Sequence, residues 1–150
     1  MSDLRDLYQE VILDHGRNPR NFHALENPTC SLEGYNPLCG DKLTLYLKLD
    51  GDRIEEISFE GAGCAISTAS ASLLSEMLVG KTREDVSRIF ASFHAMVTGE
   101  PGQAIDMDVL GKLAVFQGVC EYPARVKCAS LSWHTLNAAL DGASEPITTE

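Results

Sequence analysis

The sequence predicts an α+β fold, with strands gathered early in the chain and helices late. Residues 43–49 alternate leucine with polar residues, the pattern of a strand with one buried face, and Asp50-Gly51 follows as a two-residue hairpin signal. Beyond Cys64, apolar residues recur at three- and four-residue spacing, which indicates helices. The 150 residues are enough for one domain with its own hydrophobic core.

The first part of the chain is predicted to hold one helix and three strands. The helix should end near His15, because apolar residues recur at helical spacing up to that point. Three extended segments follow, at residues 29–33, 43–49 and 53–59. In the last of these the alternation slips between Ile54 and Ile57, which predicts a β-bulge near residues 55–56.

The remainder of the chain is predicted to be helical. Helices are expected at residues 65–79, from 82 into the 90s, at 107–116, and from about 123–126 to 140. Gly80 should end the first of them. Thr82, with Asp85 three residues later, resembles a capping box for the second. The buried stripe of the last helix should consist of Val126, Ala129, Trp133, Leu136 and Leu140.

Charge and composition narrow the class of protein. The net charge of −10 argues against nucleic acid or an anionic membrane as a partner, since both attract basic surfaces. No apolar run approaches the roughly 20 residues that span a bilayer, and no secretory signal pattern begins the chain. We therefore expect a cytoplasmic protein with a single domain over residues 1–141 and a loose polar tail over residues 142–150.

The five cysteines are the residues most able to carry chemistry. They stand at positions 30, 39, 64, 120 and 128. An odd, widely spread set in a reducing compartment does not indicate a disulfide framework. Metal ligands, reactive thiols and small buried hydrophobic residues are the alternatives, and the last is expected for Cys30 and Cys120. Surface or helix-flanking positions, and not metal ligation, are expected for His15, His23, His94 and His134.

The predicted hairpin brings three candidate residues together. With Asp50 and Gly51 as the turn, paired positions sum to about 101, so position 41 faces about position 60 and position 39 about position 62. Cys64 lies just beyond that strand end, beside Cys39 and Asp41. These last two share a parity, so both should point to the leucine face of the strand, under the helices. A bulge would shift the register by one residue and keep the proximity.

Cys64 and Cys128 are predicted to come from the starts of helices. Gly61-Ala62-Gly63 provides a flexible strand-to-helix turn before Cys64, and Cys128 follows two basic residues near the start of the last helix. Helix N-termini and nearby cations favour the thiolate, the form that binds metal and attacks sulfur. Three thiolates and the Asp41 carboxylate would complete a tetrahedral zinc site, and they would equally ligate an iron–sulfur cluster.

Plainer interpretations of these residues stay open. No Cys-x-x-Cys pair is present, so the spacing alone is a weak metal signal. Cys39, Cys64 and Cys128 would then be small buried hydrophobic residues. Asp41 would be a charge at a strand edge, and Gly61-Ala62-Gly63 an ordinary turn. From the residues alone, the sequence predicts a thiolate metal site of unassigned purpose.

Three segments resemble the signature segments of a known family. They are Asn36-Pro37-Leu38-Cys39-Gly40-Asp41, Gly61-Ala62-Gly63-Cys64-Ala65-Ile66-Ser67 and Arg125-Val126-Lys127-Cys128-Ala129-Ser130-Leu131. From about residue 4 to residue 140 the chain is similar to the NifU N-terminal, or IscU/SufU, family. The resemblance implies a three-stranded antiparallel sheet covered on one face by helices, the SufE/NifU-like fold. It also implies a site formed by Cys39, Asp41, Cys64 and Cys128.

Two features favour the SufU branch of that family. The IscU branch usually carries a histidine directly before its third cysteine, after a Leu-Pro-Pro-Val-Lys segment that its chaperone binds. Here Lys127 stands at the position of that histidine, and the stretch reads Tyr122-Pro123-Ala124-Arg125-Val126-Lys127. The interval between Cys64 and Cys128 is also longer than in the IscU branch, and residues 93–108 resemble the extra segment of SufU proteins.

The resemblance implies a zinc-containing sulfur acceptor of the SUF system, a sulfurtransferase-like carrier in iron–sulfur cluster assembly. Its partners would be a pyridoxal-phosphate-dependent, SufS-like cysteine desulfurase and other SUF assembly proteins. Zn²⁺ would hold Cys39, Cys64 and Cys128 as thiolates, with Asp41 as the fourth and most exchangeable ligand type. Cys39 would be released to take the persulfide sulfur, because it lies on the strand approach and not at a helix start. Arg125 is expected to help dock the partner.

Two other functions would use the same ligands. The first is a scaffold on which a [2Fe–2S] cluster is assembled and handed on, which sequence separates from the sulfur acceptor only by the absent histidine and chaperone segment. The second is a structural zinc-binding module, in which the metal stabilises the fold and carries no sulfur.

Overall fold

The computed structural model describes residues 3–148, with side chains from Leu7 onward. In chain order its elements are α1 (Asp3–Arg17), β1 (Cys30–Asn36), β2 (Asp41–Asp50), β3 (Arg53–Ala62), α2 (Ala65–Met77), α3 (Arg83–Thr98), α4 (Met107–Leu110), the 3₁₀ helix η1 (Gly111–Glu121), α5 (Pro123–Leu140) and β4 (Ile147–Thr148). Apart from α1 and β4, the strands precede the helices, so the α+β fold class is confirmed.

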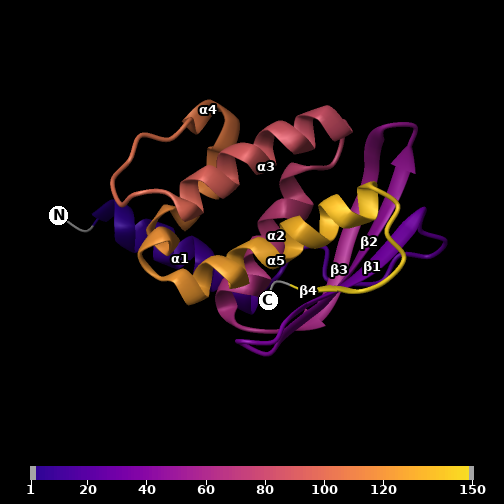
Figure 1. The fold of residues 1–150 in the computed structure, drawn as a ribbon, viewed down its shortest axis with the longest axis horizontal. Helices are drawn as coiled ribbons and strands as arrows, with labels where there is room; N and C mark the ends of the chain where they lie inside the picture. Colours follow the sequence, from indigo (N-terminus) through magenta and orange to yellow (C-terminus); the bar gives the residue numbers. More distant parts are fainter. Residues whose placement is uncertain (1–2, 149–150) are drawn as a thin grey trace.

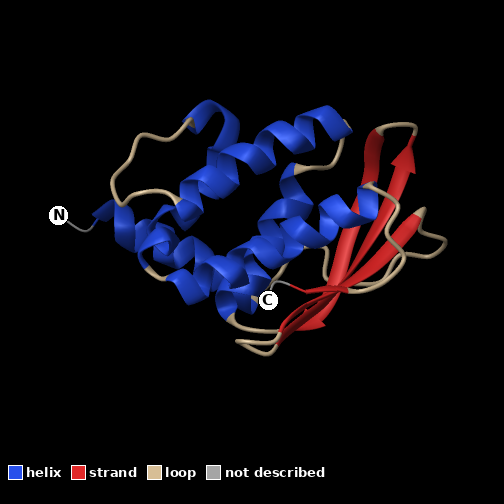
Figure 2. Ribbon diagram, in the orientation of Figure 1, coloured by secondary structure: helices blue, strands red, loops and turns tan. Residues whose placement is uncertain are grey.

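The helices gather on one side of the sheet, as Figures 1 and 2 show. The strand order is β3-β2-β1-β4, with β4 parallel to β1 and the other neighbours antiparallel. The expected three-stranded antiparallel sheet is therefore corrected to a four-stranded mixed sheet. The fourth strand comes from the segment 142–150 that was predicted as a loose tail, because Ile147 pairs with Gly34 and packs against the core. Residues 149–150 lie outside the described part.

The turn of the β2–β3 hairpin lies one residue later than predicted. Asp50 pairs with Arg53, so Gly51 and Asp52 are the turn residues. Gly51 has a φ of +64°, a left-handed conformation that glycine adopts at little cost. The glycine therefore takes the first position of the turn, and Asp50 stays in the strand.

The predicted β-bulge is present and moves the register further. The pairing shifts between Lys48 and Leu49, opposite the place where the alternation of β3 slips. Beyond the bulge, Lys42 pairs with Ala62. The start of β2 therefore lies beside the segment that leads into Cys64, and the predicted proximity survives the change of register.

One predicted helix boundary is confirmed and another is wrong. Thr82 and Asp85 each accept a hydrogen bond from the other's backbone N–H, so the capping box of α3 is confirmed. The helix predicted at residues 107–116 instead ends at Leu110. Gly111 has a φ of +51°, which an α-helix cannot continue, and the apolar residues after it are buried in η1.

The hydrophobic core lies between the sheet and the helices. The β2 leucines at 43, 45 and 47 all face it, as the alternation predicts. Trp133 of α5 is fully buried and stacks on Phe93 of α3, with ring centroids 5.1 Å apart. Burial of a Phe side chain contributes roughly 1.5–3 kcal/mol, so this pair helps to fix α5, the helix that carries Cys128. None of the helices among residues 3–148 is long and apolar enough to cross a membrane.

Candidate metal centre

Four parts of the chain meet at the candidate site. Cys39 lies in the turn between β1 and β2, and Asp41 is the first residue of β2. Cys64 directly precedes α2. Cys128 lies in the second turn of α5. The site therefore stands where one end of the sheet meets two helices, which is where the hairpin argument predicts it.

Three of the four predicted ligands are close enough to share one ion. Ligand atoms of Cys39, Asp41 and Cys128 all lie within 4.8 Å of one another. The Sγ atoms of Cys39 and Cys128 are 3.1 Å apart, and the Cys128 thiol donates to Cys39. Two sulfurs of a tetrahedral zinc site, with Zn–S bonds of about 2.3 Å, are about 3.8 Å apart. A separation of the sulfurs by about a further 0.7 Å would therefore match that geometry.

Asp41 is a buried carboxylate with neutral partners. It is 2% exposed. Its Oδ1 accepts a hydrogen bond from the backbone N–H of Cys64 at 2.8 Å, and its Oδ2 accepts one from Nδ2 of Asn36 at 3.1 Å. No ion pair among the described residues includes Asp41. A buried carboxylate is costly without a positive partner, so a divalent cation fits the chemistry of this donor set.

Gly63 leaves open the space that the Asp41 carboxylate occupies. A Cβ atom at Gly63 would lie 2.6 Å from Oδ1 of Asp41, nearer than Cβ atoms approach a neighbour. The segment Gly61-Ala62-Gly63 is therefore more than a flexible turn. Its last glycine allows the carboxylate to reach the backbone N–H of Cys64.

Cys64 stands at the N-terminus of α2, as predicted, but its sulfur is not in the group of three ligand atoms found among the described residues. Its Sγ instead accepts a hydrogen bond from the backbone N–H of Ser67 at 3.4 Å and so caps α2. The side chain is half-buried. To act as the fourth ligand, the Cys64 sulfur would have to exchange some of this capping interaction for the metal.

The prediction that its helix position favours a thiolate at Cys128 is wrong for the metal-free protein. The residue is 0% exposed and lies beyond the first turn of α5, and basic Arg125 is exposed. The pKa of the Cys128 thiol is raised first by burial and then by hydrogen bonds with its neighbours, Cys39, Asp41 and Cys64. A bound metal would reverse this preference, because a coordinated thiol is deprotonated.

Asn36 is the site residue that the sequence analysis did not single out. It ends β1 and is fully buried. Its Nδ2 donates to Asp41 and, at 3.4 Å, to the Sγ of Cys128. The available signal was its place three residues before Cys39 in a signature segment. The contact with Cys128 spans 92 positions of the chain and depends on tertiary packing.

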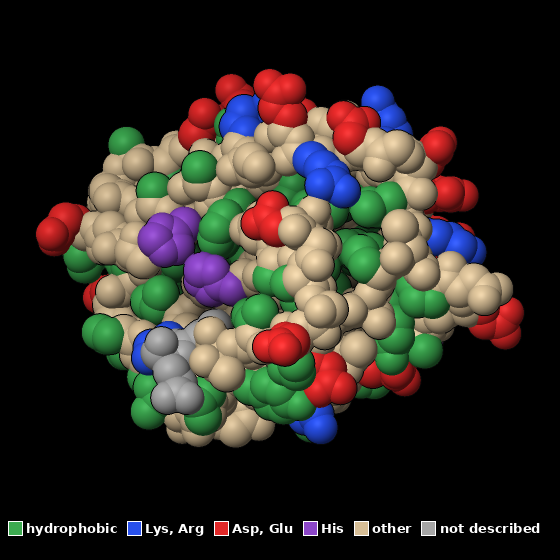
Figure 3. Space-filling view, turned by 45° about the vertical axis from the view of Figure 1, so that its right-hand side comes forward, with side chains coloured by type: hydrophobic (Ala, Val, Ile, Leu, Met, Phe, Trp, Pro, Cys, Tyr) green, Lys and Arg blue, Asp and Glu red, His purple; other side chains and the backbone are tan. Residues whose placement is uncertain are grey.

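The histidines lie outside the three-residue metal group of the described chain. His94 of α3 and His134 of α5 are neighbours, with ring centroids 6.3 Å apart. Figure 3 shows two adjacent histidines on the surface with hydrophobic side chains around them. Both rings pack against Phe90. Because both rings contact Phe90, this pair belongs to an aromatic cluster. Burial, and to a lesser extent the charge of His94, lowers the pKa of His134.

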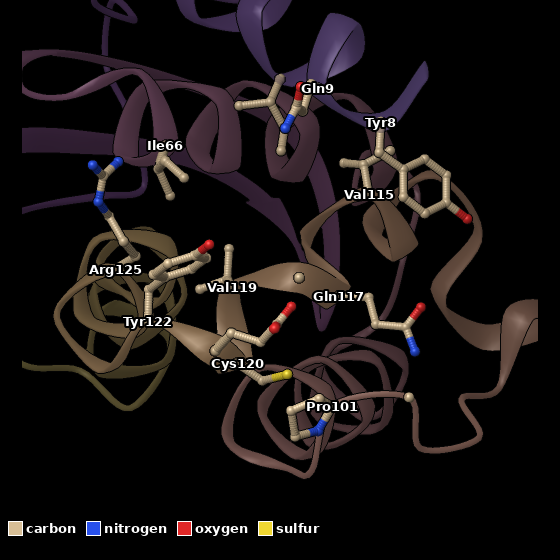
Figure 4. A pocket seen from close by; sticks show the side chains of 14 residues that line it. Tyr8, Gln9, Ile66, Pro101, Val115, Gln117, Val119, Cys120, Tyr122 and Arg125 are labelled. Atoms are coloured by element: carbon tan, nitrogen blue, oxygen red, sulfur yellow. The ribbon is translucent and has the colours of Figure 1, made fainter. Parts of the chain in front are cut away.

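A hollow of about 730 Å³ is lined by residues of α1, α2, η1 and α5, and by none of the four predicted site residues. Figure 4 shows Tyr8 of α1, Ile66 of α2 and Arg125 of α5 among its lining residues. Ile66 and Arg125 belong to the two helices that position Cys64 and Cys128. Pro101, from the extra segment, also lines the hollow. A partner that covered the hollow would therefore contact both of these helices.

Comparison with known proteins supports the resemblance. The profile of the family described as NifU-like N terminal domain matches residues 7–129, a span that contains all four predicted site residues. The zinc-dependent sulfurtransferase SufU of Bacillus subtilis is 44% identical over 136 residues, which cover 90% of each chain. The iron–sulfur cluster assembly scaffold protein IscU of Streptococcus pyogenes is 36% identical over 140 residues, which cover 93% of this chain and 86% of that protein.

A solved structure has the same fold. It is the crystal structure of SufU from Fervidobacterium islandicum, described as a scaffold protein of iron–sulfur cluster assembly for the SUF system. The two chains are 39% identical and superpose with a TM-score of 0.82. The match covers 91% of this chain and 98% of the other, so the two chains share their fold over nearly their whole length.

Proposed function

Because this chain belongs to the NifU-like N terminal domain family, we propose that it is a zinc-containing sulfur acceptor of iron–sulfur cluster assembly. The zinc ligands would be Cys39, Asp41, Cys64 and Cys128. Bound zinc would keep the thiols in the thiolate form at neutral pH. The observation that carries the proposal is the uneven burial of the ligand group, in which Cys39 is exposed whereas Asp41 and Cys128 are buried.

Cys39 is the residue that would accept the sulfur. Its thiolate would attack the terminal sulfur of a persulfide on the donor protein. A new S–S bond forms on Cys39, the S–S bond of the donor breaks, and the donor cysteine leaves as a thiolate. The reaction moves one sulfur atom without net oxidation, so it needs no further oxidant. Exposure matters here because a donor protein must reach the sulfur in line.

The donor that fits this chemistry is a pyridoxal-phosphate-dependent, SufS-like cysteine desulfurase, which carries sulfur as a cysteine persulfide. Arg125 is exposed and lines the 730 Å³ hollow beside α2 and α5. We therefore propose that Arg125 contacts an acidic group of this partner. A reducing compartment such as the cytoplasm would keep the thiols free for this role.

Desulfurase turnover tests the proposed function. The zinc-loaded chain should increase sulfur release from cysteine by the desulfurase several-fold, and Cys39→Ala should abolish the increase. Cys30→Ala is the matched control, because Cys30 is a half-buried cysteine that belongs neither to the ligand group nor to the lining of the hollow, and it should behave as the unaltered chain. Full stimulation by Cys39→Ala would refute the role of Cys39.

A cluster scaffold is the second candidate, favoured by the 36% identity to a protein named as an IscU scaffold. It would use the same thiolates and carboxylate as cluster ligands. Anaerobic reconstitution with iron, sulfide and desulfurase separates the two functions. A stable cluster that moves to an apo-ferredoxin, and whose transfer zinc inhibits, would favour the scaffold. A chain that retains zinc and forms no transferable cluster would favour the sulfur acceptor.

A further inference from the structure

Asn36 touches the two buried members of the ligand group at once. Its Nδ2 lies 3.1 Å from Oδ2 of Asp41 and 3.4 Å from Sγ of Cys128. Its backbone carbonyl also accepts the N–H of Cys39, at 3.3 Å. One residue thus connects the strand end, the turn and α5, and it does so while fully buried.

The side-chain amide of Asn36 faces both partners with its NH₂ group. That group has two hydrogens, which match two acceptors, a carboxylate oxygen and a sulfur. Within the described chain, Oδ1 of Asn36 is buried and has no hydrogen-bond partner. The amide therefore leaves its acceptor unsatisfied while both of its donors point at ligand atoms, as two anionic ligands would require.

The side chain of Cys39 is less buried and has fewer contacts than those of Asp41 and Cys128. Its side chain is exposed, and its sulfur accepts a hydrogen bond from the Cys128 thiol. The next residue, Gly40, has a φ of +72°, and a Cβ atom there would meet no neighbour. The turn around Cys39 is therefore open, whereas the surroundings of Asp41 and Cys128 are closed.

We propose that Asn36 is a positioning residue that holds Asp41 and Cys128 as the retained ligands, so that Cys39 is the ligand that exchanges. The inference rests on the proposed metal and deepens it by giving an order of ligand release. Release of Cys39 is already expected from the sequence, whereas burial and two hydrogen bonds argue against Asp41 as the most exchangeable ligand type. Asn36 acts through Asp41 and Cys128 and does not react with sulfur itself.

Alkylation of the zinc-loaded chain tests this order of release without any desulfurase. Iodoacetamide labelling, quantified by mass spectrometry over time, should modify Cys39 at least tenfold faster than Cys128 in the unaltered chain. Asn36→Leu removes both donors and keeps the number and branching of the side-chain heavy atoms. It should lower this ratio at least fivefold and speed zinc release to a chelator by about the 10–100-fold that loss of an outer partner costs.

Ser58→Ala is the matched control, because Ser58 is another buried polar residue whose hydroxyl has no partner in the described chain, and it lies in β3. It should leave the labelling ratio unchanged. Asn36→Ser keeps one donor and should give an intermediate ratio, which provides a readout if Asn36→Leu does not fold. An unaltered ratio in either folded Asn36 variant would overturn the proposal. Labelling order is measured apart from sulfur transfer, so the two proposals can fail separately.

Discussion

The buried and open sides of the metal centre are built in different ways. On the buried side, Asp41 and Cys128 are 2% and 0% exposed, and both accept hydrogen bonds from Asn36. On the open side, Cys39 is exposed in a turn and Cys64 is half-buried at a helix start. This difference supports the proposal that one side retains the metal and the other side reacts.

The largest effect should come from Asp41→Ala, which removes the buried carboxylate. Zinc affinity should fall by more than the roughly 10–100-fold that loss of an outer partner costs, and by more than in Cys39→Ala. The free energy of unfolding of the metal-free protein should change by less than the free energy of zinc binding. Loss of the hydrogen bonds of Asp41 destabilises the fold, but removal of an unpaired buried charge offsets that loss. Zinc competition assays and chemical denaturation check this. Equal affinities in the two variants would mean that the two sides do not differ.

Gly63→Ala should have the next largest effect. The new methyl group would lie 2.6 Å from Asp41 Oδ1, so the carboxylate must move and lose its bond to Cys64 N–H. We expect a loss of about 1–3 kcal/mol in stability, together with weaker zinc binding. Gly118→Ala is the matched control, since a Cβ there would meet nothing within 4 Å. Normal zinc binding by Gly63→Ala would show that the position of Asp41 is not critical.

Cys64→Ser should separate stability from metal binding. Serine caps helices well, so it would take over the hydrogen bond from Ser67 N–H that the Cys64 sulfur accepts at 3.4 Å. The metal-free variant should be more stable by a few tenths to about 1 kcal/mol, whereas zinc binding should weaken. Thermal unfolding without metal and zinc titration measure the two quantities. A decrease in both metal-free stability and zinc affinity would mean that the Cys64 sulfur stabilises the fold by packing and not by capping α2.

The smallest effect should come from His15, which lies in the last turn of α1 and outside the ligand group. The ring is buried and contacts Ser72 Oγ at 2.7 Å, and burial, with the charge of Arg20, lowers its pKa. The unfolded chain therefore takes up this proton first, so stability should fall as the pH drops below about 6.5. In metal-free denaturation series His15→Asn should flatten that slope. An unchanged slope would assign the pH dependence to other groups.

The elements with strong local patterns were predictable from the sequence. The leucine alternation predicted β2, and the Thr82–Asp85 pair predicted the capping box of α3. The two-residue strand β4 has no period to detect, and it forms only because β1 offers a free edge. The 3₁₀ helix η1 was missed because a positive φ at Gly111 is not visible in apolar spacing.

The candidate site was predictable only in part. The hairpin predicted that Asp41 approaches Cys64, and the two are hydrogen-bonded even though the register differs. Parity predicted that Cys39 lies under the helices, which is wrong, because Cys39 is exposed in the turn before β2. The burial of Cys128 and the two contacts of Asn36 depend on how α5 packs against β1, which no local pattern encodes. The sequence predicted release of Cys39 with Asp41 as the most exchangeable ligand type, and in the structure Asp41 is among the most buried residues.

The location of the transferred sulfur tests the central claim most directly. The zinc-loaded chain would be mixed with desulfurase and cysteine, its persulfides trapped by alkylation, and the modified cysteine identified by mass spectrometry of peptides. The account predicts the added sulfur on Cys39, with little on Cys64 or Cys128. Sulfur found mainly on buried Cys128 would contradict the division between a retaining side and a reacting side, and sulfur found mainly on Cys64 would contradict the role of Cys39.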